Sequence, residues 1–289
     1  ILIPGVMEHI DRAGIHSGDS ISVYPAVSLS RKVQDTIVDY TRRLASALQV
    51  VGMMNIQFIV YNETVYIIEV NPRSSRTVPY ISKVTGIPAI ALATRAMLGE
   101  RLADMGYGTG LYRHSGYYAI KMPVFSFEKI LGADTSLGPE MKSTGEVLGL
   151  GANMQEALFK GLVSAGYKVE KSGHAGVLIS VNRRDQPEIV NIARKLDEMG
   201  FRLYATDGTA REISRLGTDV EVVGKLGRDN RVFQLLESGR IDYVILTGST
   251  EPEYIRDFIH LNHRCVQLGI PCLTSLDTAK AVSYTHLTL

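Results

Sequence analysis

Three side chains with oxygen donors, followed closely by two arginines, are the first candidates for chemistry in this sequence. They are Gln57, Glu69 and Asn71, and then Arg73 and Arg76. Carboxylate and amide oxygens are ligands that Mg²⁺ or Mn²⁺ accepts, and such an ion usually keeps positions for water and nucleotide phosphates. A guanidinium group matches phosphate or carboxylate oxygens at two points. These residue types therefore suit a metal-assisted phosphate site, provided that the fold brings them together.

A β-hairpin is the element that must position these side chains. Residues 54–60 and 65–70 are rich in β-branched residues, which favour strands, and Asn71-Pro72 ends the second segment. We interpret 62–64 as a three-residue hairpin loop. The two segments are then antiparallel neighbours, and their pairing register decides which side chains meet.

The loop length sets this register. A three-residue loop places Tyr61 opposite Val65, and counting outward places Gln57 opposite Glu69. Asn71 lies two residues beyond Glu69 and therefore points to the same face. We predict that these three side chains converge. A solvent-exposed hairpin face often carries the same residue types. The spacing alone therefore gives even odds between a metal site and an ordinary hydrated surface.

A second candidate group begins with Thr206 and Thr209, in the sequence TDGT between a predicted strand and a predicted helix. Backbone N–H groups and the helix dipole favour an anion at such a position, and the two hydroxyls add donors. Lys225, Thr247 and Ser249 could close the same pocket, because ligands of parallel sheets bind at the carboxyl ends of strands. Threonine and serine also cap helices in many proteins, so each residue alone has a structural interpretation as well.

The first half of the chain shows one amphipathic helix and further irregular segments. Apolar residues recur at helical spacing after Ser30, a plausible N-cap, and continue to Gln49. Residues 86–98 are also predicted to be helical. Residues 104–115 and 132–151 are rich in glycine, tyrosine or turn residues, which predicts loops.

The second half alternates strands with helices, after a linker that we place near 161–171. Strands alternating with helices of this length favour a parallel sheet that is covered on both faces. The predicted strands are 176–181, 202–206, 241–247 and 270–274, with helices opened at Asp185-Pro187 and Asp207-Gly208 and closed by Gly200 and Gly217.

Length and composition indicate an ordinary globular chain. Its 289 residues suggest two domains, and 31 basic against 30 acidic residues give no reason to expect a nucleic-acid or anionic-membrane partner. Cys265 and Cys272 have no metal-ligand spacing, so we interpret them as buried thiols of a reducing compartment. Residues 1–6 are too short for a signal or membrane segment, which favours a soluble cytoplasmic protein. Both ends look cut, and residues 283–289 continue no earlier pattern.

The hairpin sequence resembles a known family. The run Met54 to Gly86 (MNIQFIVYNETVYIIEVNPRSSRTVPYISKVTG) is similar to the signature of carbamoyl-phosphate synthase large subunits. Its RTVPYISK portion resembles the second synthetase half of that family, which phosphorylates carbamate. Gly5 to Ser20 (GVMEHIDRAGIHSGDS) matches as well, and the resemblance extends over about residues 1–282.

The resemblance implies a role for each residue of the first group. Gln57, Glu69 and Asn71 would hold the divalent ions that bridge the ATP phosphates, with Gln57 and Glu69 also contacting the nucleotide. Arg73 and Arg76 would act as catalytic residues near the transferred phosphoryl group. ATP and Mg²⁺ or Mn²⁺ are the implied cofactors, and K⁺ is a further candidate ion.

A stretch near the start of the chain resembles the nucleotide-contacting segment of the family. It consists of Gly14, Ile15, His16 and Ser17. We favour a ligand-contacting role for His16 and a structural role for His9.

The implied reaction is the ATP-dependent phosphorylation of carbamate to carbamoyl phosphate. Phosphoryl transfer requires mainly positioning and neutralisation of charge, so no protein nucleophile is needed. The glycine-rich lid and the basic residues on the other side of the ATP would lie before Ile1. The isolated chain is therefore expected to be inactive.

The second half resembles the methylglyoxal-synthase-like regulatory domain that ends these subunits, on the segments GFRLYATDGTAREI, VVGKLG and PCLTSLDTA. This resemblance implies an allosteric nucleotide site that includes Thr206, Thr209, Lys225, Thr247 and Ser249. The sequence departs from some members at two places. Gln186 replaces a phosphate-binding lysine, and Thr247-Gly248-Ser249 replaces an Asn-Thr-Thr type of turn, so the identity of the effector stays open.

These observations predict an α/β protein with two domains. Residues 1–165 are expected to form the C-terminal part of an α+β ATP-grasp domain, and residues 166–289 a Rossmann-like parallel-sheet domain. The expected partners are a glutaminase small subunit, small-molecule substrates, a nucleotide effector and further copies of the protein. The function would serve pyrimidine and arginine biosynthesis. The alternatives are another ATP-grasp ligase and a non-catalytic effector-binding fragment.

Overall fold

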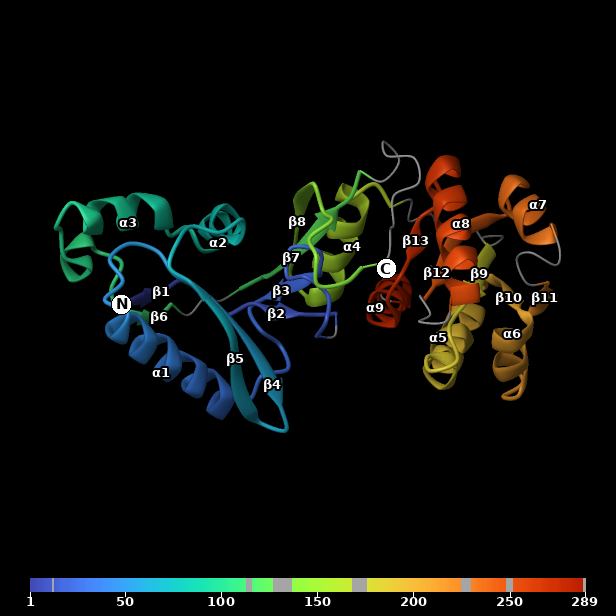
Figure 1. Ribbon diagram of the computed structural model, residues 1–289, viewed down its shortest axis with the longest axis horizontal. Coiled ribbons are helices and arrows are strands. Elements are labelled where there is room, and N and C mark those ends of the chain that lie inside the picture. Colours follow the sequence, from blue (N-terminus) through green and yellow to red (C-terminus); the bar gives the residue numbers. More distant parts are fainter. Residues whose placement is uncertain are drawn as a thin grey trace. The chain divides into compact units, whose positions relative to one another are not determined.

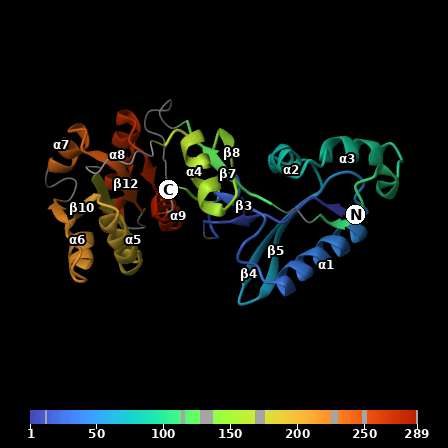
Figure 2. The ribbon, with the colours of Figure 1, turned by 180° about the vertical axis from the view of Figure 1, so that it is seen from behind.

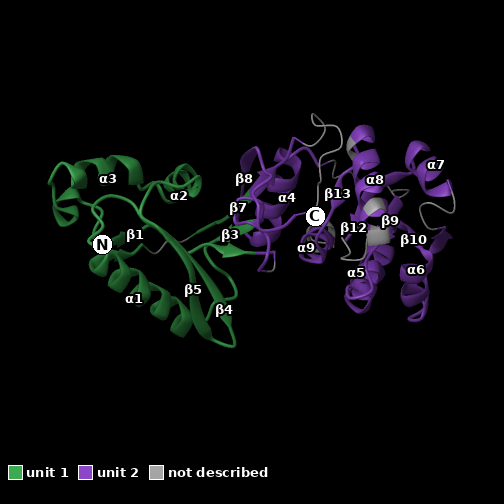
Figure 3. Ribbon diagram, in the orientation of Figure 1, with its two compact units in different colours: residues 1–9, 22–121 green, residues 10–21, 122–289 purple. Residues whose placement is uncertain are grey.

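The chain forms two compact units. The computed structural model describes residues 1–11, 13–112, 116–126, 137–167, 176–224, 230–247 and 252–287. One unit contains residues 1–9 and 22–121, and the other contains residues 10–21 and 122–289 (Figure 3). This division by compactness does not follow the predicted domain boundary at 165/166, which stays a prediction.

In the first unit, helix α1 (Arg31–Ala47) supports the hairpin. Ser30 is its N-cap, as predicted, and the Ser30 hydroxyl accepts a hydrogen bond of 3.3 Å from the Val33 N–H. Val33 and Ile37 are buried on one face of the helix, where they pack with Val65 of the hairpin. The apolar side chains that recur along α1 therefore cover one face of the hairpin (Figure 1).

The hairpin consists of β4 (Asn55–Tyr61) and β5 (Thr64–Asn71). Its loop has two residues, so the predicted three-residue loop is wrong, and Tyr61 pairs with Thr64 where Val65 was predicted. Asn62 and Glu63 both have positive φ, at 48° and 62°, which is typical of a type I′ turn. The sequence signal was weak because glycine is usual at the second position of this turn.

Smaller elements complete the first unit. The predicted helix 86–98 is α3 (Ala89–Met97), and helix α2 (Thr77–Thr85) directly precedes it. Strand β1 (Leu2–Ile3) pairs in parallel with β6 (Gly110–Leu111), and a short 3₁₀ helix, η1 (Leu102–Met105), follows α3. Strand β3 (Ser22–Tyr24) is antiparallel to β2 (Glu8–His9) on one side and to β7 (Tyr118–Val124) on the other.

In the second unit, strand β8 (Gly145–Gly151) packs closely on helix α4 (Met154–Ser164). The sequence predicted a loop up to residue 151 and a linker from residue 161, and both predictions are wrong at these positions. A Cβ on Gly149 would lie 2.0 Å from the Ala157 carbonyl oxygen and 2.5 Å from the Gly161 nitrogen. The glycines that suggested a loop therefore allow a strand and a helix to approach without side chains between them.

A five-stranded sheet in the second unit confirms the predicted parallel α/β architecture. Its order is β11-β10-β9-β12-β13, and all neighbouring strands are parallel. The strands are β9 (Gly176–Ser180), β10 (Arg202–Thr206), β11 (Glu221–Val223), β12 (Ile241–Leu246) and β13 (Cys272–Leu273). The helices are α5 (Gln186–Glu198), α6 (Asp207–Ser214), α7 (Arg231–Glu237), α8 (Pro252–Leu268) and α9 (Leu276–Leu287). Figure 2 shows these elements from behind.

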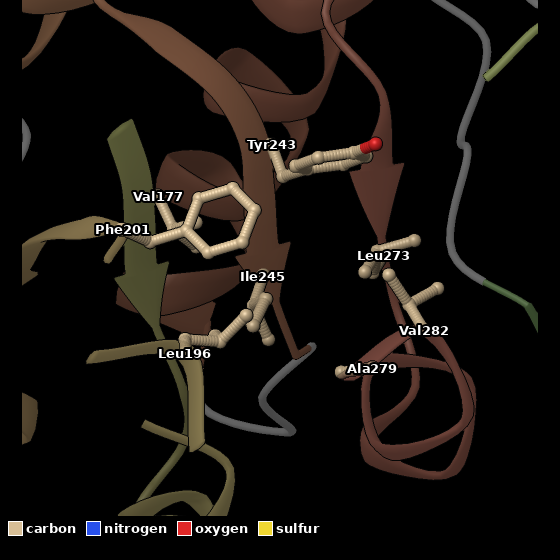
Figure 4. A pocket seen from close by; sticks show the side chains of 8 residues that line it. All are labelled: Val177, Leu196, Phe201, Tyr243, Ile245, Leu273, Ala279 and Val282. Atoms are coloured by element: carbon tan, nitrogen blue, oxygen red, sulfur yellow. The ribbon is translucent and has the colours of Figure 1, made fainter. Parts of the chain in front are cut away.

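The sheet buries apolar side chains on both faces. Leu178, Tyr204 and Val244 pack in one cluster with residues of α7 and α8, including Leu261. On the opposite face, Figure 4 shows Val177, Leu196, Phe201, Tyr243, Ile245, Leu273, Ala279 and Val282 around a gap of about 10 Å³. A gap of this size with apolar walls is a packing defect of the core rather than a ligand site.

Candidate functional site

The outer face of the hairpin gathers the predicted oxygen donors around one carboxylate. Glu69 Oε1 accepts hydrogen bonds from Gln57 Nε2 at 2.6 Å and from Asn71 Nδ2 at 2.9 Å. The Glu69 side chain is exposed, and those of Gln57 and Asn71 are half-buried. The predicted convergence of these three side chains is therefore confirmed as geometry, whereas their role stays a prediction.

A β-bulge produces this convergence. Phe58 pairs with Ile67, but the next pair is Gln57 with Glu69, so Ile68 is an extra residue on β5. A regular two-residue hairpin would have paired Gln57 with Ile68. The prediction reached the correct pair because an assumed extra residue in the loop had the same effect on the register as the actual extra residue in the strand.

The arginines of the first group follow β5 directly. Both side chains are exposed, and Arg73 Nη1 donates to the Ser74 carbonyl oxygen at 2.9 Å. Arg76 lies at the N-cap of α2. The structure thus places both arginines on the short connection after the strand that carries Glu69 and Asn71.

The donor set of the hairpin suits a hard divalent cation. Mg²⁺ and Mn²⁺ prefer oxygen ligands, and the site offers one carboxylate and two amides on a face that water can reach. The amides now direct N–H groups at Glu69, so holding an ion requires them to turn their carbonyl oxygens toward it. Since one carboxylate supplies the only negative charge of this set, an ion would depend on nucleotide phosphates for further ligands. Among the described residues, no group of three or more His, Cys, Asp or Glu could hold a metal.

The predicted nucleotide-contacting stretch is part of the second unit, in the segment 10–21. His16 Nδ1 accepts the Gly18 N–H at 3.0 Å, which leaves the other ring nitrogen to carry the proton of a neutral imidazole. The His16 N–H donates to the Gly138 carbonyl oxygen at 2.7 Å. The structure describes this stretch and the hairpin each within its own unit.

Asp19 anchors this stretch, and sequence reasoning missed it. Its two carboxylate oxygens accept the backbone N–H groups of Lys142 and Ser143, both at 2.8 Å. The side chain is 2% exposed. A buried carboxylate needs such donors, but its partners lie more than 120 residues away in the sequence, so no local signal marks them.

His9 has a different environment. Although the His9 side chain is exposed, desolvation by the protein atoms around its ring and then the charge of Lys121 lower the pKa of His9 to about 4. The two residues flank Ser22 on neighbouring strands, because Ser22 pairs with His9 on one side and with Lys121 on the other. His9 is therefore neutral at neutral pH.

The carboxyl ends of three parallel strands bring together the threonines of the second group. Thr206 Oγ1 donates to Ser180 Oγ at 3.3 Å, and Thr247 Oγ1 accepts the Asn182 N–H at 2.9 Å. Thr209 Oγ1 accepts the Val181 N–H at 3.3 Å. The strand end at 180–182, which sequence reasoning did not single out, is the common partner.

These hydrogen bonds also change what is expected of Thr209. Its side chain is 1% exposed, so its hydroxyl ties α6 to the end of β9. Thr206 precedes α6 but makes no side-chain capping bond, so its hydroxyl does not occupy the first N–H groups of the helix. A Cβ on Gly208 would lie 3.1 Å from Gln186 Nε2, which places Gln186 beside this turn. Lys225 and Ser249 lie outside the described residues.

Comparison with known proteins connects both groups to one kind of protein. Residues 1–105 match the family described as "Carbamoyl-phosphate synthase L chain, ATP binding domain", and residues 188–274 match the family described as "MGS-like domain". The carbamoyl phosphate synthase large chain of Lachnoclostridium phytofermentans is 55% identical over 283 residues. That alignment covers 98% of this chain and 26% of the relative, so this chain spans about a quarter of the relative's length.

One further comparison adds less. The crystal structure of methylglyoxal synthase from Elizabethkingia anophelis NUHP1 is similar at 22% identity, over 38% of this chain and 78% of that chain. Its TM-score of 0.33 is too low to support an argument. Within the part of the chain that the structure describes, no helix is both long and apolar enough to cross a membrane.

Proposed function

We propose that this chain is a C-terminal part of a carbamoyl-phosphate synthase large chain, which its sequence matches support. In this protein, the hairpin provides the metal-binding side of a site that phosphorylates carbamate with ATP. The observation that carries this proposal is the hydrogen-bonded set of Gln57, Glu69 and Asn71 on one face. A divalent ion bound there would neutralise charge on the ATP phosphates.

The residues of this chain have positioning roles in the proposed reaction. Before an ion binds, the amides of Gln57 and Asn71 hold the Glu69 carboxylate in one orientation, and α1 supports the strands from the opposite face. Arg73 and Arg76 bring guanidinium groups that can pair with phosphate oxygens. Because phosphoryl transfer depends on orientation and charge neutralisation, these groups suffice for this side of the site. The proposal also includes a glutaminase partner that supplies ammonia, and a function in pyrimidine and arginine biosynthesis. It further includes K⁺ as an additional ion and a cytoplasmic location.

Glu69→Gln tests the metal role because it removes the charge and keeps the shape. In the complete large subunit we expect the variant to lose ATP synthesis from carbamoyl phosphate and ADP by a factor of roughly 10²–10³, as for other groups that stabilise charge during catalysis. Glu63→Gln, at the tip of the same hairpin, is the matched control and should retain the rate. A Glu69→Gln enzyme as fast as wild type would refute the site.

We further propose that the parallel-sheet domain binds a nucleotide monophosphate and regulates the enzyme. Two observations support this proposal. Thr206 and Thr247 converge on the strand end at 180–182, and the Thr206 side chain does not cap the first turn of α6. Helix N–H groups with nearby hydroxyls suit a phosphate.

Gln186→Lys offers a gain-of-function test of this sensor. It adds a positive charge beside Gly208, so we expect tighter binding of uridine or inosine monophosphate by calorimetry on the full chain. Thr206→Val should weaken binding while circular dichroism stays native. Unchanged affinity in both variants would place the nucleotide elsewhere. Binding without any effect on synthesis in the complete enzyme would favour a non-regulatory ligand site.

A further inference from the structure

Two cysteines of the second unit have no part in either proposed site. Cys265 lies on α8 and is fully buried, and Cys272 lies on β13 and is half-buried. They are seven positions apart, and both thiols are free. Their positions bring two nucleophilic sulfur atoms together inside one apolar cluster.

The turn after α8 produces this proximity. Helix α8 ends at Leu268, and Gly269 has a φ of 67°, which turns the chain back. The Ile270 N–H then donates to the Cys265 carbonyl oxygen at 2.9 Å. The Pro271 carbonyl oxygen accepts the Val244 N–H at 2.9 Å, which fixes the start of β13 beside β12.

The two side chains meet as a result. Cys272 packs against the buried cluster that contains Cys265, Leu261 and Val244. Cys265 is also the group that most affects the pKa of the Cys272 thiol, so the two thiols are neighbours within this cluster. One thiol comes from the helix and the other from the strand, and backbone hydrogen bonds hold each of these elements.

We infer that Cys265 and Cys272 form a modification site, which a peroxide converts to an intramolecular disulfide that joins α8 to β13. The Cys272 thiolate, on the more accessible side chain, attacks a peroxide oxygen, breaks the O–O bond and becomes a sulfenic acid with release of hydroxide. The Cys265 sulfur then attacks Cys272 Sγ, loses its proton and displaces the sulfenic oxygen as water. The two thiols lose two electrons in total, and one peroxide gains them.

The surroundings set the speed of the first step. The neighbouring Cys265 side chain, and then burial, raise the pKa of the Cys272 thiol well above its usual range. Tyr167 also faces Cys272, and burial, Cys272 and Asp11 raise the pKa of the Tyr167 phenol to about 12. Because only the thiolate attacks, the rate should rise about tenfold for each pH unit below the pKa of Cys272.

The experiment treats the folded full chain with hydrogen peroxide, quenches it with N-ethylmaleimide and maps its peptides by mass spectrometry. We expect a species that has lost two hydrogen atoms, carries no maleimide and contains a linked Cys265–Cys272 peptide. Its rate of formation should be about a hundredfold higher at two pH units above neutrality. Reduction with dithiothreitol should restore both thiols.

Single variants assign the order of the steps. Cys265→Ser should leave Cys272 as a sulfenic acid that dimedone captures, and Cys272→Ser should leave the buried Cys265 unreacted. Circular dichroism verifies that each variant is folded, and the wild-type peptide map decides the question if one is not. Three outcomes would each overturn the inference. They are disulfides between chains, dimedone capture at Cys272 in the wild type without a Cys265–Cys272 disulfide, and thiols that react only after denaturation. None of these outcomes depends on the proposed catalytic function.

Discussion

At the residue scale, the most informative side chains have partners that differ from those their types suggest. Thr209 was predicted to donate to an anion, but its buried hydroxyl accepts the Val181 N–H. Thr206, the last residue of β10, donates to the Ser180 hydroxyl. Variants at Thr209 therefore report on folding, whereas Thr206→Val tests the proposed nucleotide site.

His9 gives a prediction for the pH dependence of stability. Its pKa is lowered from 6.5 to about 4 in the folded protein, so the unfolded chain binds more protons between these values. Stability should therefore fall as the pH drops through this window. His9→Gln should flatten this part of the profile. The measurement is urea unfolding of both proteins from neutral pH down to pH 4.

The control for this prediction is His263→Gln, on α8 in the other unit. It should leave the contribution of His9 to the pH profile intact. A His9→Gln profile that is parallel to wild type across the whole window would show that the imidazole is accessible to protons in the folded state.

At the element scale, the bulge at Ile68 decides the chemistry of the hairpin. Without it Glu69 would pair with Ile56, on the face that packs against α1. A side-chain period of two means that one residue moves every side chain beyond it to the other face. The metal-site hypothesis therefore depends on an irregularity of the strand.

Deleting Ile68 tests this account of the register. Without the extra residue, Glu69 follows Ile67 directly and pairs with Gln57 in a regular hairpin, so we expect the Gln57–Glu69 contact and any Mn²⁺-induced broadening of the hairpin resonances to persist. Ile68→Ala keeps the length of the strand and is the matched control, since the Ile68 side chain is 55% exposed. If the deletion variant lost the Gln57–Glu69 contact, Ile68 would not be the extra residue of the strand.

The contact between β8 and α4 gives a second prediction at this scale. Gly149→Ala introduces a methyl group where 2.0 Å separates the Cβ position from a backbone oxygen, so we expect a cost of about 1–3 kcal/mol. Gly145→Ala on the same strand is the control, because its nearest atom is 3.8 Å away. Equal unfolding midpoints for the two variants would contradict the close packing.

At the scale of the whole molecule, the second unit contains residues from both ends of the chain. Its segment 10–21 packs with residues beyond 122. Asp11 is one link, since its carboxylate accepts the Ile21 N–H at 2.8 Å and the Thr278 hydroxyl at 3.0 Å. The segment that contains the predicted nucleotide-contacting stretch is therefore connected to α9 of the proposed regulatory domain.

This link predicts measurable coupling. Thr278→Val removes a donor to a carboxylate that is 7% exposed, so we expect a loss of roughly 1.5–3 kcal/mol and faster hydrogen exchange in residues 10–21. Asp11→Asn combined with Thr278→Val should cost less than the sum of the single changes. Strict additivity would show that the two side chains do not interact in solution.

The sequence by itself determined the features that depend on local patterns. The N-cap and apolar stripe of α1, the two hairpin strands, and the alternation of β9, α5, β10 and α6 all follow from spacing and from capping or turn residues. The threonines of the second group could be placed for the same reason, because carboxyl ends of parallel strands share one edge. Strand β11 and helices α7 to α9 were not predicted, since their short or mixed patterns are supported by tertiary packing.

Only the tertiary structure decided which partners those residues have. The two-residue turn, with Glu63 in a conformation that favours glycine, is tied to α1 through the Ser30 hydroxyl. The local sequence around Gly149 predicts a loop, and only the folded chain packs α4 against it. Asp19 finds both of its backbone donors, and Asp11 finds one of its two donors, more than 100 residues away. Such contacts involve chain segments that no sequence window contains together, so their energy enters only when the folded units form.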